Sequence, residues 1–202
     1  MNRISFLLLS AVVTAVLPAI SQTEKGSWEL SFTGNAGSYS QKSEYTSGGQ
    51  THTNEGEARS YAALDFRAGY FLVDGLSLEP EFYFLGVEKT LPTYNLGVNV
   101  AYTFTIPESP VRPFLIAGYG TGNGIPMMQR LLARESENLD IPVLRVGGGL
   151  KVLLNRWVAL KVEYRYERYT DEQSTQYYSS KTVSNYGNIL FGFSFFLPAR
   201  GS

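Results

Sequence analysis

Near its end the chain reads Asn188-Ile189-Leu190-Phe191-Gly192-Phe193-Ser194-Phe195. The odd positions hold only isoleucine and phenylalanine, whereas the even positions mix asparagine, leucine, glycine and serine. Because successive side chains of a β-strand point to opposite faces, this strand presents an aromatic row to one side and a mixed row to the other. Lipid suits such an aromatic row, and a strand can lie in lipid only as part of a closed barrel.

The same alternation occurs in seven further segments. Together they predict strands over residues 28–33, 62–72, 76–84, 94–104, 111–119, 144–152, 158–167 and 188–195. In each segment one row of alternate side chains contains no charge; in 158–167 this row is Val158, Leu160, Val162, Tyr164 and Tyr166. A lysine or arginine at the middle of a bilayer costs about 2–4 kcal/mol, so uncharged rows are what lipid contact selects. The sequence therefore predicts an all-β fold, an eight-stranded antiparallel up-and-down transmembrane barrel.

The opposite rows hold nearly all charges of the predicted strands, with the two signs in balance. The interior of an eight-stranded barrel is just wide enough for side chains to fill. We therefore expect an ion-pair network in the lumen, formed by Glu29, Asp65, Arg67, Glu79, Glu81, Arg112, Arg145, Lys151, Lys161, Glu163 and Arg165. The neighbouring carboxylates Glu79 and Glu81 could also bind a cation or transfer protons, but the cations of the same rows favour structural pairing.

The predicted connections alternate in length. Those at 73–75, 105–110 and 154–156 are short, whereas 39–60, 86–93, 120–141 and 168–185 are long or polar. This alternation is typical of outer-membrane barrels, which have short periplasmic turns and long external loops. Pro80 lies inside a predicted strand and predicts a bulge or a local break in the ladder, because proline has no N–H to donate.

Residues 1–21 read as a cleaved secretory signal peptide, with Arg3 before an apolar stretch and with Ala19 and Ser21 at the cleavage positions. The alternative is a helical membrane anchor, but the apolar run is shorter than the ~20 residues that span a bilayer. Residues 22–202 then form the barrel domain. The near-neutral balance, Lys+Arg 17 against Asp+Glu 18, argues against nucleic acid as a partner. The absence of cysteine excludes disulfides and thiol chemistry.

These features resemble the small eight-stranded outer-membrane barrels of the OmpA/OmpX type and the porin-like barrels of similar size. The segments 146–151 and 160–166 are similar to the penultimate hairpin of that family. An alternate row of the last strand resembles the C-terminal signal that such proteins show to the barrel-assembly machinery: Ile189, Phe191, Phe193 and Phe195. The family often ends on its final aromatic residue, whereas seven more residues follow Phe195 here. The resemblance implies an outer-membrane location, with outer-membrane lipid, lipopolysaccharide and the assembly machinery as partners.

The third long connection contains a second candidate site. Residues 126–135 predict a short helix that begins with proline. Its apolar cluster could contact a partner, lipid headgroups or the mouth of the barrel, or could simply pack on its neighbours: Met127, Met128, Leu131 and Leu132.

The sequence favours a non-enzymatic function. No catalytic, cofactor-binding or metal-ligating spacing occurs, and the single histidine, His52, lies in the first long connection. Barrel enzymes that modify lipids can place a histidine in that loop, but they also need an oriented serine and a carboxylate beside it. We therefore expect a structural or surface-interaction role in adhesion or envelope contact, with an extracellular or envelope protein as a possible partner. The alternatives are a narrow porin for small solutes and, less favoured, a lipid-modifying enzyme.

Overall fold

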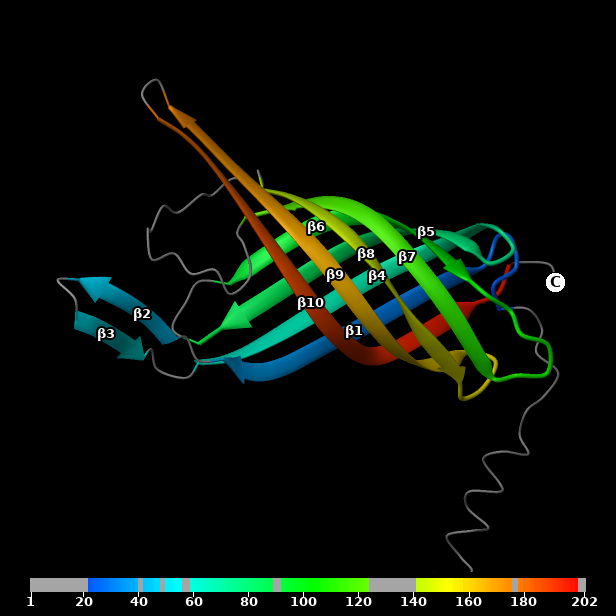
Figure 1. The fold of residues 1–202 in the computed structure, drawn as a ribbon. Coiled ribbons are helices and arrows are strands. Elements are labelled where there is room, and N and C mark those ends of the chain that lie inside the picture. Colours follow the sequence, from blue (N-terminus) through cyan, green and yellow to red (C-terminus); the bar gives the residue numbers. More distant parts are fainter. Residues whose placement is uncertain are drawn as a thin grey trace, which may run out of the picture.

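A computed structural model describes residues 22–39, 42–47, 50–55, 59–88, 92–123, 141–175 and 178–199. Eight strands form a closed antiparallel barrel in the order β1-β10-β9-β8-β7-β6-β5-β4, and β2 and β3 form a separate two-stranded sheet (Figure 1). The barrel strands are β1 (Trp28–Tyr39), β4 (Arg59–Val73), β5 (Leu76–Val87), β6 (Thr93–Thr103), β7 (Val111–Gly122), β8 (Ile141–Leu153), β9 (Val158–Thr175) and β10 (Tyr178–Leu197). The predicted fold class and the predicted number of barrel strands are confirmed.

The two faces of the wall follow the alternation of the sequence. On β9, the side chains of Leu160, Val162 and Tyr164 are exposed on the outside, and those of Lys161 and Glu163 are buried inside. The same rule holds around the barrel, where many large apolar side chains are exposed and most of the buried residues are polar or charged. This inverts the usual arrangement of a protein in water and fits a wall surrounded by lipid. In the described part of the chain, no helix is both long enough and apolar enough to cross a membrane.

Three short connections lie at one end of the barrel, which we call the turn end; the opposite end is the loop end. At Asp74-Gly75 the chain turns through a positive φ of 79° at Gly75, whose N–H donates to the carbonyl of Thr23. Residues 104–110 join β6 to β7. In the third turn, Asn155 Oδ1 accepts hydrogen bonds from the N–H groups of Trp157 and Val158. Side-chain acceptance of this kind explains the asparagine at this turn.

Two of the predicted long loops contain strands instead. The first holds the hairpin of β2 (Lys42–Ser47) and β3 (Gln50–Glu55). In the fourth, β9 and β10 remain paired to Thr175 and Tyr178, so most of residues 168–185 forms a ladder rather than a loop. This ribbon projects beyond the rest of the barrel (Figure 1). The signal peptide and the helix at 126–135 lie outside the described residues.

Pairing between neighbouring strands is uneven. Between β4 and β5, pairs flank Pro80 on both sides but none forms at Pro80, and the only shift of register lies between Phe71 and Val73. The predicted break at the proline is therefore present without a bulge. Between the first and last strands, pairing stops at Gly34↔Phe191, although both strands continue toward the loop end. We call this boundary the β1–β10 seam.

Candidate functional site

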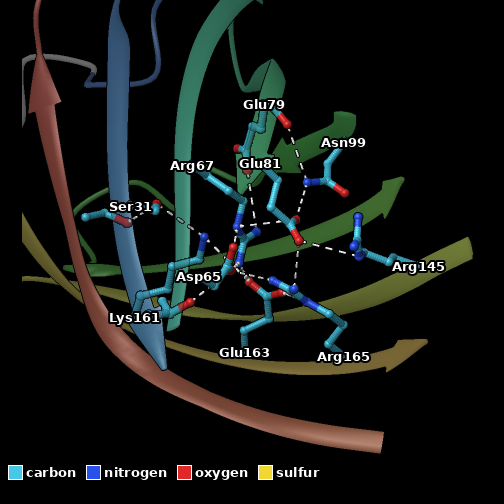
Figure 2. A network of polar contacts seen from close by, with 12 residues as sticks. Ser31, Asp65, Arg67, Glu79, Glu81, Asn99, Arg145, Lys161, Glu163 and Arg165 are labelled. Atoms are coloured by element: carbon cyan, nitrogen blue, oxygen red, sulfur yellow. Dashed lines mark hydrogen bonds and ion pairs between the residues drawn. The ribbon is translucent and has the colours of Figure 1, made fainter. Parts of the chain in front are cut away.

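The lumen contains a network of buried charges whose centre lies on β4, β5 and β9 (Figure 2). Asp65 Oδ2 accepts hydrogen bonds from Arg67 Nη2 at 2.7 Å, from Arg165 Nη2 at 2.6 Å and from Thr33 Oγ1 at 3.0 Å. Glu163 lies between the same two arginines, 2.5 Å from Arg67 Nη2 and 2.9 Å from Arg165 Nε. Two guanidinium groups and two carboxylates thus neutralise one another, as burial of charge demands.

A second group of contacts extends the network toward β8. Glu81 Oε1 lies 3.1 Å from Arg165 Nη1 and 3.4 Å from Arg145 Nε. Arg145 Nε also lies 3.1 Å from Glu167 Oε1. Glu79 Oε2 approaches Arg67 Nη1 at 3.6 Å. Every charged group of this region therefore faces at least one charge of opposite sign.

Nearer the turn end, a smaller cluster surrounds Glu29. This carboxylate accepts hydrogen bonds from Lys151 Nζ at 2.6 Å and from Ser194 Oγ at 2.6 Å. Lys161 Nζ lies 3.6 Å from Glu163 Oε2 and so connects this cluster to the central one. The Phe114 ring lies beneath both lysines, with its centroid 5.0 Å from Lys151 Nζ and 4.8 Å from Lys161 Nζ. A ring face stabilises such cations beyond their ion pairs.

Apolar side chains pack beside the charges of the lumen. Toward the loop end, one buried cluster contains Ala63, Tyr83 and Leu85, and another contains Ile141, Val143 and Tyr169. Toward the turn end, Ala101, Phe114 and Ile116 form a third cluster. Charged and apolar side chains thus fill the lumen together, which makes it a poor medium for a passing ion.

The structure brings the predicted lumen residues into mutual contact, with one exception. Arg112 is buried but donates to the carbonyls of Ile106 and Ser109 at 2.7 and 2.8 Å, and it forms no ion pair with the described residues. It lies at the start of β7, where these carbonyls are nearer to the guanidinium than the carboxylates of the lumen are. Prediction from the sequence omitted Glu167, although it follows Arg165 in the same inward row. It also omitted the neutral partners of the network: Ser31, Thr33, Asn99, Thr103 and Ser194.

The four residues of the expected assembly signal lie on the outer face of β10. Their side chains are all exposed: Ile189, Phe191, Phe193 and Phe195. The strand continues beyond them to Leu197, and Phe196 points inward and is buried. Two of the residues after Phe195 therefore complete the barrel wall, pairing with Trp28 and Glu29.

The single histidine lies on the separate two-stranded sheet. His52 is on β3, opposite Tyr45. The candidate contact surface, Met127, Met128, Leu131 and Leu132, falls outside the described residues. Within the described ranges, no three His, Cys, Asp or Glu side chains are grouped so as to hold a metal ion.

Known protein families and solved structures include proteins similar to this chain. The profile of the outer membrane protein beta-barrel domain family matches residues 4–195. The chain belongs to this family. No curated protein matches it significantly.

The chain is also similar to solved structures of other barrels. Neisserial surface protein A superposes with a TM-score of 0.55 at 17% identity, covering 85% of this chain and 97% of that one. The N-terminal barrel of OprF from Pseudomonas aeruginosa gives 0.46 at 16% identity, covering 86% and 98%. OprG from the same organism gives 0.41 at 15% identity, covering 88% and 99%. At these identities the likeness to Neisserial surface protein A supports the architecture and leaves the activity open.

Proposed function

We propose that this barrel is a structural and surface-interaction protein of a Gram-negative-type outer membrane. The observation that carries the proposal is the filled lumen, in which ion pairs such as Arg165–Asp65 and Lys151–Glu29 occupy the interior together with buried apolar clusters. Because such an interior offers a solute no free path, we assign the function to the outer surface and the loop-end elements of the barrel. In this arrangement the turn end faces the periplasm and the loop end faces outside. The outer wall contacts outer-membrane lipid and lipopolysaccharide, and Ile189, Phe191, Phe193 and Phe195 serve recognition by the assembly machinery.

The β9–β10 ribbon is the element best suited to contact an extracellular or envelope protein. The β8–β9 ladder ends at Val143↔Tyr169, while the β9–β10 ladder continues to Thr175↔Tyr178. Within the described part of the chain, no strand flanks the ribbon as β1 and β8 flank its base. Exposed strand edges offer rows of N–H and C=O groups, and such edges commonly bind an extended segment of another protein.

A deletion tests this role. The ribbon is shortened by replacing residues 171–182 with a two-residue Asn-Gly turn, and the full chain is displayed on a laboratory Gram-negative strain. We expect the shortened protein to assemble at the same level and to lose adhesion of the cells to protein-coated surfaces. A matched deletion of residues 42–55 in the β2–β3 hairpin serves as the comparison and should leave most adhesion intact. Unchanged adhesion after the ribbon is shortened would contradict the proposal.

Two alternatives make different predictions. A narrow porin would conduct ions steadily in planar bilayers, and a current of porin size from the purified full chain would overturn the preference for a surface role. A lipid-modifying enzyme would depend on His52. Acyl transfer or deacylation of lipopolysaccharide by the wild-type chain, lost in His52→Ala, would support that alternative.

A further inference from the structure

One part of the inner wall consists of glycine. At four adjacent inward positions on β6 and β7 the residue has no side chain of its own: Gly97, Gly118, Gly120 and Gly122. We call this surface the glycine wall. It borders the loop half of the lumen, because the same strands carry Ala101, Ile116 and Phe114 toward the turn end.

Three polar side chains lie against the glycine wall. Asn99 Oδ1, Arg145 Nη1 and Asn95 Oδ1 lie 1.8, 2.3 and 1.5 Å from where a Cβ atom would stand at Gly118, Gly97 and Gly122, so a side chain at these glycines would displace them. They follow one another toward the loop end in a fixed order: Asn99 at Gly118, Arg145 at Gly97 and Gly120, and Asn95 at Gly122. Acceptor, donor and acceptor therefore alternate along the wall.

Hydrogen bonds on the other side of the two amides fix this polarity. Asn99 Nδ2 donates to Glu81 Oε2 at 2.5 Å, and Asn95 Nδ2 donates to Tyr169 Oη at 3.2 Å. A flip of the Asn99 amide would bring two oxygens together and lose a bond to a carboxylate. The amide oxygens consequently face the wall.

Among the described residues, these atoms have no hydrogen-bond partner. The unpartnered atoms are the Oδ1 atoms of Asn95 and Asn99 and both Nη atoms of Arg145, and all three residues are at least 98% buried. A buried polar group without a partner costs about 1–3 kcal/mol, and such groups usually bind internal water. The Arg145 charge already faces Glu81 and Glu167, so its Nη groups do not require an anion.

The spacing and chemistry select the ligand. Inward positions two residues apart on a strand are about 6.6–6.8 Å apart, and two hydrogen bonds through one oxygen span roughly 5.8 Å. The ligand must accept from a guanidinium N–H and donate to an amide oxygen, which a water molecule does. We propose that a short file of water molecules lies along the glycine wall, bridging Arg145 to Asn99 on one side and to Asn95 on the other.

The file ends blindly at Asn99. The next inward positions toward the turn end belong to Ala101 and Ile116, which pack with Phe114 in a buried apolar cluster. This cluster offers water no hydrogen-bond partner from its side chains. The file therefore stops at Asn99 and does not continue along β6 and β7 toward the turn end. This inference is independent of the surface role proposed above.

Nuclear Overhauser effects between water and backbone amides test the file. The isotope-labelled full chain is refolded into lipid nanodiscs, and cross-peaks to the water signal are recorded. We expect cross-peaks at the wall glycines and none at Ala101, Phe114 or Ile116. In Asn95→Leu, which removes one acceptor, the cross-peak at Gly122 should be lost. In the control Ser194→Ala, which alters the network near the turn end, all wall cross-peaks should remain.

Each outcome decides the matter. The exposed turn amides of the folded protein serve as a positive control for water cross-peaks. If they show cross-peaks and the wall glycines do not, the proposal is overturned. Cross-peaks of equal strength at Ile116 and Phe114 would overturn the blind end. If Asn95→Leu fails to fold, Asn99→Leu removes the other acceptor, and its effect is read at Gly118. A cross-peak that survives the removal of its own acceptor also counts against the file.

Discussion

Arg165 and Asp65 meet across the lumen, with Nη2 2.6 Å from Oδ2, although 100 positions separate them in the sequence. Their strands, β9 and β4, are not neighbours in the barrel. A single contact of this kind therefore fixes the distance between opposite walls. Arg165 makes similar contacts with Glu81 and Glu163, so that one side chain holds together strands β4, β5 and β9.

Removal of this side chain should destabilise the barrel strongly. In Arg165→Met, carboxylates including Asp65 and Glu163 lose a cation while remaining buried, and the loss of one partner of a buried pair costs about 3–5 kcal/mol. We expect the midpoint of urea unfolding in lipid vesicles to fall accordingly. The control Arg168→Met changes an exposed arginine of the same strand and should shift the free energy by no more than about 0.5 kcal/mol.

The Lys151–Glu29 pair should behave as a coupled unit. Lys151→Met leaves the Glu29 carboxylate buried without its main counter-charge, and Glu29→Gln does the same to the Lys151 ammonium group. The double variant removes both charges. A double-mutant cycle should give an interaction energy of about 0.5–3 kcal/mol, as found for residues in direct contact. Combining Lys151→Met with the remote Arg168→Met should be additive. An additive result for the Lys151–Glu29 cycle would show that the 2.6 Å contact contributes no coupling to the free energy of unfolding.

A charge placed on the outer wall should be costly only at the depth of the hydrocarbon. Val98 is exposed near the middle of β6, and Ile106 is exposed in the turn that follows it. Val98→Arg should reduce folding stability in vesicles by about 2–4 kcal/mol, and Ile106→Arg by about 0–1 kcal/mol. Equal effects at the two positions would argue that Val98 does not face lipid.

The turn at Gly75 should not accept a side chain. Its φ of 79° is left-handed, and an added Cβ would come within 2.7 Å of the Thr103 carbonyl oxygen. Gly75→Ala should therefore cost at least about 1–2 kcal/mol. Gly86→Ala is the matched control, because a Cβ there would meet no atom closer than 3.7 Å. Unfolding in urea compares the two variants, and equal stability would show that the turn relaxes.

The wall of the barrel is predictable from the sequence because lipid acts on one face only. Between Val158 and Glu167 the alternation of apolar and charged residues reports both the strand and its orientation. Beyond Tyr169 the β9–β10 ribbon extends past the β8–β9 ladder. Its residues there are mostly polar, with many serines and threonines, and no apolar row alternates with a charged one. The hydrogen-bonded ladder continues nevertheless, which is why residues 168–185 were predicted as a loop.

Contacts inside the lumen are only partly predictable. Alternation assigns Arg112 to the inner face correctly, but it does not say how far along the barrel axis the guanidinium lies or that nearby carbonyls bind it. The pairing of Arg67 with Glu163, 96 positions away, depends on the closure and stagger of all eight strands. The glycine wall likewise has no signal in a single strand, since β6 and β7 create it together.

The β1–β10 seam has a mechanical consequence. A closed wall fails where its ladder is shortest, and here the first and last strands separate after Gly34 and Phe191. Heating, or a pulling force applied to the ends of the chain, should therefore separate β1 from β10 before any other pair of neighbouring strands. Strands β4 to β9, joined by longer ladders, would still hold together as a curved sheet when the split begins.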